Sequence, residues 1–369
     1  MDDHLIASTT IAWLAFALGV IFGFVGNKTN FCTLGAISDA MNIGDWGRMR
    51  MWALAMAVAI VGATALQLGG LIDLHKSIYT GPRLLWLSHI VGGLLFGAGM
   101  TLASGCGSKS LIRIGTGNLK SLVVFVFLGI AAYMTLRGLF GTWRVAALDS
   151  VGIDLGSTQD IPAILSRQTG LAADIAIMIT TAIVGGGLGL FALASRDAWR
   201  SDILIGGLVI GAVVVAGWYV SGHVGFVAEH PDTLEEAFIG TNSGRMETFT
   251  FVAPYAFSLE LLMFWSDTSK IVTFGIAAVL GVTAGSALYA LLTRSFRLES
   301  FRDANDLLRH LSGAIMMGFG GVTALGCTIG QGISGVSTLA LGSLITTAAI
   351  IAGSALTMKI EYWKLMREG

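Results

Sequence analysis

The sequence predicts an all-α integral membrane protein, and three observations predict it. Of its 369 residues 54% are apolar and only 12% are charged, about half the charged share of a soluble domain. The mean hydropathy of +0.77 leaves too little polar surface to cover a soluble fold. Glycine occurs 50 times and proline four times, a balance that suits closely packed membrane helices. The lipid bilayer is therefore the expected environment.

About nine transmembrane helices are expected, because a membrane helix needs about 20 mostly apolar residues. Small residues recur four apart in several of them, as at Gly19 and Gly23, and this spacing lets helix backbones approach closely. The stretches that qualify are 7–26, 50–71, 85–105, 120–140, 171–194, 202–220, 271–293, 309–327 and 337–358.

Basic residues between the spans predict the orientation. The loops after odd-numbered spans, together with the C-terminal tail, carry twelve of them against six on the opposite face. Lys28, Lys109 and Arg113 are left out of the twelve as residues of segments that dip into the membrane. The positive-inside rule then places the N-terminus outside and the C-terminus in the cytoplasm.

Composition and missing motifs exclude several function classes. A net charge of −1 argues against a nucleic-acid partner. The run Gly115–Lys120 lacks the spacing of a phosphate-binding loop, and there is no H-E-x-x-H, no G-x-S-x-G and no cysteine pair with zinc spacing. The sequence therefore predicts no enzyme and no cofactor or metal site. It predicts that any transport is not driven by nucleotide hydrolysis in this chain.

An internal repeat is the most informative feature. Residues 89–106 and 310–327 match at a constant offset of 221, with seven of eighteen positions identical, including His89/His310 and Cys106/Cys327. We expect a first half of four spans (1–145), a linker with one span (146–200) and a second half of four spans (201–369). An odd linking span inverts the second half, and inverted repeats enclose substrate sites near the bilayer midplane in many transporters.

Three cysteines, Cys32, Cys106 and Cys327, all lie in short breaks rich in Gly, Ser and Thr. Irregular backbone at membrane depth is tolerated only where it is buried in protein or lines a wet cavity. Short re-entrant half-helices starting at such breaks would direct free N–H groups at an anion. A single cysteine in a membrane helix is more often a small buried apolar residue. The shared setting of these three cysteines favours a functional role along a transport pathway.

The breaks and one later polar segment supply further candidates. Arg245 lies in the polar run 241–248, where it either faces an anion or pairs with Glu247 at the surface, and the apolar stretch 249–265 is expected to dip into the membrane. His89 and His310 are either interfacial or proton-coupling residues. The candidates within the breaks are Asn30, Thr33, Gly107, Ser108, Lys109, Thr328 and Gln331.

The run 30–33, Asn-Phe-Cys-Thr, and the G-x-G-x5-G-C runs 97–106 and 318–327 resemble the YeeE/YedE sulphur-transport family. The resemblance implies a bacterial inner-membrane protein, shaped like an hourglass about a pseudo-twofold axis, that takes up thiosulfate past the motif cysteines. It also implies a cytoplasmic TusA-like sulphur-carrier partner. The sequence departs from a strict repeat, since no cysteine in 221–262 matches Cys32 and Gly330 replaces Lys109.

We therefore expect thiosulfate to pass from one cysteine to the next through S–H···S contacts. Backbone N–H groups around Thr33, Gly107, Ser108 and Thr328 would hold the oxyanion end. A transporter of sulfite, sulfide or a selenium compound is an alternative, and only substrate competition distinguishes it from a thiosulfate transporter. A membrane-embedded sulphurtransferase is a further alternative. It would need an activated thiol, and Lys109, three residues from Cys106 in the sequence, is the positive charge that could activate it.

Overall fold

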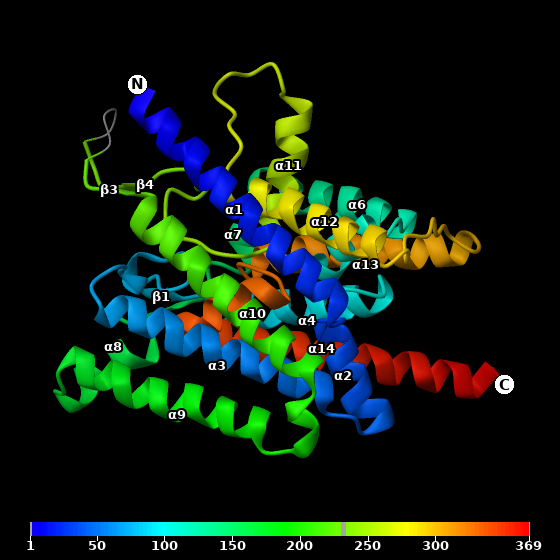
Figure 1. Ribbon diagram of the computed structural model, residues 1–369, viewed down its shortest axis with the longest axis horizontal. Helices are drawn as coiled ribbons and strands as arrows, with labels where there is room; N and C mark the ends of the chain where they lie inside the picture. The colour runs from blue at the N-terminus through cyan, green and yellow to red at the C-terminus, as the bar shows by residue number, and fades with distance from the viewer. Residues whose placement is uncertain (1, 230–233, 369) are drawn as a thin grey trace.

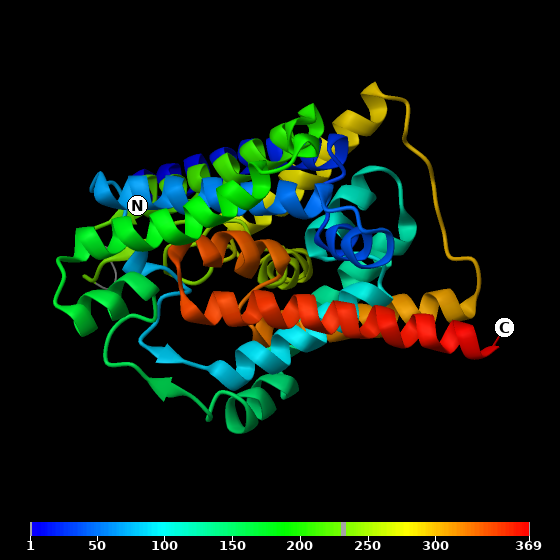
Figure 2. The same cartoon turned by 90° about the horizontal axis from the view of Figure 1, so that it is seen from below.

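The computed structural model describes residues 2–229 and 234–368. Long helices make up most of it, and shorter ones sit between them (Figures 1 and 2). The α-helices are α1 (Asp2–Lys28), α2 (Thr33–Ser38), α3 (Gly47–Leu68), α4 (Trp86–Leu102), α5 (Gly107–Gly115), α6 (Leu119–Arg137), α7 (Leu139–Ala147), α8 (Ile161–Thr169), α9 (Ala173–Leu193), α10 (Ser201–Tyr219), α11 (Ala253–Met263), α12 (Phe274–Leu292), α13 (Ala304–Thr323) and α14 (Leu341–Glu368).

Other secondary structure is short. Two small antiparallel sheets of two strands pair β1 (Arg83–Leu84) with β2 (Ile153–Asp154) and β3 (Phe226–Val227) with β4 (Ala237–Phe238). The remaining helical pieces are the π-helical η1 (Asp39–Ile43), η4 (Val220–Val224) and η5 (Gly330–Gly335) and the 3₁₀-helical η2 (Leu74–Lys76), η3 (Arg196–Trp199) and η6 (Val336–Thr338).

All nine predicted spans are helical, but only eight qualify as membrane spans. Within the described residues, eight helical stretches are long and apolar enough to cross a bilayer. The predicted span that does not qualify, 309–327, corresponds to α13, which begins earlier and includes the charged residues Asp306 and Arg309 in its first turns. These charges lower its hydropathy below that of the other eight, so the predicted count of nine is only partly confirmed.

The long helices pack in a few close pairs. α3 lies between α9 and α10, α1 packs along α12, and α4 packs against both α13 and α14, while α6 packs on α13. The N-terminal end of α1 and the C-terminal end of α14 lie at opposite ends of the long axis in both views (Figures 1 and 2). The short helices α5 and η5 lie among these long ones, α5 against α1, α6 and α12 and η5 against α3, α10 and α14, while α2 packs on α3 and α14.

Glycines allow the close crossing of α4 and α13. A Cβ atom at Gly92 would lie 2.7 Å from the Gly320 carbonyl oxygen, and one at Gly313 would lie 2.6 Å from the Gly99 carbonyl oxygen. Real Cβ atoms do not approach backbone so closely, so only glycine allows the helices to touch. Gly92 and Gly313 are equivalent positions of the sequence repeat, as are Gly99 and Gly320.

Candidate functional site

The three cysteines occupy turns that share a backbone hydrogen-bond pattern and a left-handed residue. Each turn ends one helix and starts the next: Cys32 joins α1 to α2, Cys106 joins α4 to α5, and Cys327 joins α13 to the segment that continues as η5. Two residues before each cysteine lies a non-glycine residue in the left-handed region, and these are Asn30 (φ 52°), Ser104 (φ 57°) and Leu325 (φ 60°).

Backbone hydrogen bonds repeat in the same way. The N–H of the residue before each cysteine donates to the carbonyl five residues earlier, as in a Schellman helix ending; these bonds are Phe31 to Gly26 (3.0 Å), Gly105 to Met100 (2.9 Å) and Gly326 to Gly321 (2.7 Å). The cysteine carbonyl then accepts the first bond of the new helix, from Ala36 (3.0 Å), Ser110 (2.9 Å) and Gln331 (2.8 Å). Left-handed non-glycine residues are strained, and such strain gathers at functional sites.

Each sulphur lies at the N-terminal end of the helix that follows it. Cys106 and Cys327 are fully buried and Cys32 is 8% exposed. The N–H of Gly35 donates to Cys32 Sγ at 3.4 Å and that of Gly330 to Cys327 Sγ at 3.3 Å. Cys106 Sγ lies 3.3 Å from the Ser108 hydroxyl. The thiols therefore share their surroundings with donors that an anion would also use.

Cys106 is the middle member of the three. It is close enough to Cys32 to interact with it electrostatically, and it interacts in the same way with Cys327. The fully buried Tyr255 of α11 interacts with both Cys106 and Cys327, and its hydroxyl donates to the Gly107 carbonyl. Nothing in the sequence pattern singled out Tyr255, which is one tyrosine in an apolar stretch.

The buried segment 246–252 packs against two of the cysteine turns. A Cβ atom at Gly107 would lie 3.0 Å from the Phe251 carbonyl oxygen, and one at Gly330 would lie 2.4 Å from Thr250 Oγ1. The Ser334 hydroxyl donates to the Phe249 carbonyl at 2.7 Å. Phe249 and Phe251 are fully buried, and α11 follows directly and packs on α6 and α12. Of the stretch expected to dip inward, residues 249–260 are mostly buried and residues 262–265 are exposed, and the dip into the membrane stays a prediction.

Several buried polar atoms near these turns have no hydrogen-bond partner in the described residues. Buried polar groups are costly unless paired, so unpaired ones mark a place that accepts a polar ligand. The sequence predicted Thr33, Thr328 and Gln331 but missed Trp52, which lies in an apolar span, and Tyr79, which lies in a loop between two predicted spans. The atoms are Thr33 Oγ1, Trp52 Nε1, Tyr79 Oη, Thr328 Oγ1 and Gln331 Oε1.

Cations surround the Cys32 turn. Lys109 Nζ donates to Asn30 Oδ1 at 2.5 Å, which links the Cys106 helix to the Cys32 turn. Lys109 and Arg113 both interact electrostatically with Cys32. The Arg48 guanidinium lies beside Gly35 and pairs with Asp39 at 3.2 Å. The sequence identified Asn30 and Lys109 as candidates but not Arg48, whose span-edge position is typical of many arginines.

At Cys327 the neighbouring polar groups differ. Tyr79 interacts electrostatically with Cys327 and with Glu247. Glu247 is 8% exposed, and burial raises the pKa of its carboxyl to about 7, against the hydrogen bond from Ser243. Arg245 is exposed, and no ion pair joins it to Glu247 among the described residues. The surface pair that the sequence left open is therefore absent, and a pathway role for Arg245 stays a prediction.

His89 and His310 are buried and hydrogen-bonded. His89 Nδ1 lies 2.7 Å from Thr346 Oγ1 of α14, and His310 Nδ1 lies 2.7 Å from the Asp306 carbonyl and 3.1 Å from its carboxylate. His89 therefore links α4 to α14, whereas His310 bonds within its own helix α13. A proton-coupling role for either histidine stays a prediction.

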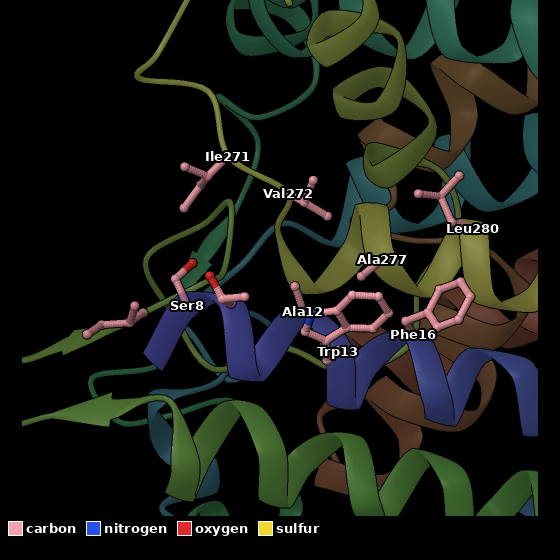
Figure 3. A pocket seen from close by; sticks show the side chains of 10 residues that line it. Ser8, Ala12, Trp13, Phe16, Ile271, Val272, Ala277 and Leu280 are labelled. Carbon is pink, nitrogen blue, oxygen red and sulfur yellow. The ribbon is translucent and has the colours of Figure 1, made fainter. Parts of the chain in front are cut away.

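A large groove on the surface lies apart from the cysteines. It has a volume of about 680 Å³ and is lined mostly by apolar residues of α1, α12 and the segment before α12 (Figure 3). Trp13 in this groove is 68% exposed, as expected of a side chain that faces lipid. The described residues hold no cluster of three potential metal ligands.

Comparison with known proteins identifies the family. A family profile described as sulphur transport matches residues 28–356, which is most of the chain. The chain belongs to this family. The thiosulfate transporter TsuA of Escherichia coli strain K12 is 26% identical over 334 residues, covering 85% of this chain and 84% of the relative. TsuA of Spirochaeta thermophila is 25% identical over 352 residues, 93% of this chain and 96% of the relative.

A shorter match points the same way. The probable transporter YedE of Escherichia coli strain K12 is 30% identical over 103 residues, 27% of this chain and 23% of that protein. The chain is thus a multi-pass membrane protein of a sulphur-transport family, and the resemblance seen in its cysteine motifs is confirmed at that level.

Proposed function

We propose that this protein carries thiosulfate across the bacterial inner membrane into the cytoplasm. One observation carries the proposal: three turns with the same pattern of backbone hydrogen bonds bring Cys106 within electrostatic reach of both other cysteines, with unpaired buried polar atoms around them. The two TsuA relatives, named thiosulfate transporters, add support because the similarity extends over 84% and 96% of their lengths.

The chemistry of the site suits a sulphur dianion. Such an ion crosses a membrane only where donors replace its hydration shell, yet bind it weakly enough for release. A thiol is a weak donor with a polarisable sulphur, and it suits the terminal sulphur of thiosulfate. The N–H groups of Thr33, Gly107, Ser108 and Thr328 lie at helix starts, where they favour the oxyanion end. The ion passes by hydrogen bonds alone, and no covalent persulfide forms.

The ion enters near Tyr79 and Cys327, moves to Cys106 and leaves past Cys32. Lys109, Gln331 and Asn30 act along this route, and the cations near Cys32 draw the ion toward the cytoplasm. The excess of basic residues on that face supports this orientation. The termini at opposite ends of the molecule fit an odd number of spans (Figure 1). Arg245, exposed on the outer loop, attracts anions to the entrance.

An inverted repeat about a pseudo-twofold axis, with an hourglass outline, accounts for the packing. The halves are 1–145 and 201–369, joined by 146–200. Contacts at the crossing of α4 and α13 are reciprocal, as such an axis requires. The pattern extends outward: Cβ atoms at Gly97 and Gly318 would meet the carbonyls of Ile350 in α14 and Leu128 in α6, and these two carbonyls are 222 residues apart.

A TusA-like sulphur-carrier protein in the cytoplasm would accept the ion after Cys32, as the family resemblance implies. Transport of sulfite, sulfide or a selenium compound is the second candidate, because the site would offer those species the same donors. A membrane-embedded sulphurtransferase is less favoured, since every cysteine is buried among helices and the relatives are named transporters.

Substrate competition tests the proposal. Purified protein in liposomes is given sulphur-labelled thiosulfate, with unlabelled thiosulfate, sulfite, sulfide or selenite in excess. We expect labelled uptake that unlabelled thiosulfate suppresses more strongly than the other species do. Uptake no faster than into empty liposomes would overturn the thiosulfate assignment, and stronger suppression by sulfite or selenite would move it to that species.

A further inference from the structure

Glu247 is a buried carboxyl without a cation. It is 8% exposed, and its contacts are a hydrogen bond from Ser243 Oγ at 3.1 Å and one from the backbone of Asn242. In the part of the chain that the structure describes, no lysine, arginine or histidine forms an ion pair with it. Acids in such surroundings within transporters are typical proton-binding groups.

Its surroundings connect the outer loop with Cys327. Ser243 and Arg245, on one side of Glu247, are exposed, so solvent protons reach the carboxyl across a short segment. On the other side Tyr79 interacts electrostatically with both Glu247 and Cys327. The Tyr79 hydroxyl is buried without a hydrogen-bond partner of normal geometry, and Thr250 lies beside it.

The elements packed on this segment present neutral groups to it. α10 contributes Gly217 and the Val214 carbonyl, which contact Thr248, and η4 contributes Gly222, which contacts Met246. The other titratable groups nearby are engaged elsewhere or exposed: Lys76 pairs with Glu236 at 2.5 Å, and His223 Nδ1 lies 3.0 Å from the Leu71 carbonyl. Among the residues that the structure describes, Tyr79 is thus the titratable group facing Glu247 from another element.

We propose that Glu247 binds the proton that accompanies thiosulfate inward, and this inference rests on the proposed function. An ionised Glu247 would repel a dianion approaching Cys327, whereas a protonated one admits it. The proton comes from the outer solution, moves by way of Tyr79 and the pathway and is released inside. It offsets one of the two negative charges moved against an inside-negative membrane potential. Burial raises the pKa of Glu247 to about 7, so the group binds and releases protons near neutral pH.

The test measures two fluxes at once in liposomes that contain a trapped pH-sensitive dye. External labelled thiosulfate is added and both label uptake and internal pH are followed. We expect the wild type to acidify the interior as it takes up label, and an imposed inward proton gradient to raise its uptake at least threefold. Glu247→Gln should take up label without acidification and without response to that gradient.

Two variants make the result specific. Glu236→Gln removes an exposed acid near the same loop and should behave as wild type, while Glu247→Asp keeps the acid and should keep proton movement. Thiosulfate uptake by the wild type without acidification would refute the role of Glu247 and leave the proposed function intact. No uptake by the wild type would refute both. Acidification by Glu247→Gln equal to wild type would also refute the inference.

Discussion

Gly92 and Gly313 allow α4 and α13 to cross at backbone contact, and replacing either by alanine should push the helices apart. A Cβ at Gly92 would lie 2.7 Å from both the Ala324 nitrogen and the Gly320 carbonyl oxygen. Ordinary contact begins at 3.4 Å, so the helices must separate by 3.4 − 2.7 = 0.7 Å. At Gly313 the nearest atom is at 2.6 Å, which requires 3.4 − 2.6 = 0.8 Å.

Overpacking of this size costs about 1–3 kcal/mol. The two values should be similar, because the two glycines make reciprocal contacts. The displacement also reaches the proposed transport path. The new Cβ atoms meet Ala324 and Ala103, and these two residues end α13 and α4 just before Cys327 and Cys106. We therefore expect each variant to lose thiosulfate uptake as well as stability.

The assay is thermal unfolding in detergent, followed by the amount of monodisperse protein left after heating. Gly187→Ala is the matched control, since Gly187 is exposed on α9 with nothing within 4 Å of its would-be Cβ. That change should be neutral or stabilising by about 1 kcal/mol. Gly92→Ala as stable as Gly187→Ala would refute the packing argument, and a large loss in only one of the two repeat-related variants would argue against the pseudo-twofold axis.

Three further predictions follow from charged groups. Lys109→Met should raise the KM for thiosulfate uptake about tenfold, by loss of one charge-assisted contact. Lys364 is exposed, and Lys364→Met should leave the KM unchanged. A KM for Lys109→Met equal to that of the wild type would contradict this. The hydrogen bond with Asp160 raises the pKa of His75, so its stabilising effect is complete below pH 6.5 and is lost as pH rises through the raised value. The stability advantage of wild type over His75→Gln should therefore be present at pH 6 and absent at pH 9, and a constant difference would exclude the pair. Burial raises the pKa of Glu247 from 4.5 to about 7. As the pH rises from 4.5 to 7, the stability of the wild type should therefore fall by about 3 kcal/mol relative to that of Glu247→Gln. Parallel stability profiles of the two proteins over this pH interval would refute the prediction.

The helices were predictable because lipid imposes a length and a composition on each span. The exception, α13, shows the limit: its charged first turns pair with neighbours, as Asp306 does with Lys120 at 2.7 Å, and a hydropathy pattern does not show that pairing. The repeat was visible because a rare histidine and a rare cysteine fall in register, and close packing then fixes the glycines between them.

The site was predictable only where residue type itself carries the chemistry. The cysteines stand out because there are just three, and the polar breaks around them identify Thr33, Thr328 and Gln331. In the sequence Trp52 and Tyr255 look like ordinary residues of apolar stretches, and Tyr79 looks like an ordinary loop residue. Only the folded arrangement leaves the polar atoms of Trp52 and Tyr79 buried without partners and places Tyr255 within electrostatic reach of two thiols. Glu247 was considered only as a surface partner, because sequence alone does not reveal that its loop is buried.

The most direct test of the cysteine pathway is labelled thiosulfate uptake by the wild type and by the variants Cys106→Ser and Cys327→Ser in liposomes. Serine keeps a small hydroxyl donor but removes the polarisable sulphur that would face the terminal sulphur of the ion. We predict wild-type uptake that each substitution abolishes, with both variants still monodisperse and as thermally stable as the wild type. Uptake at wild-type rates by both serine variants would contradict the pathway through the thiols.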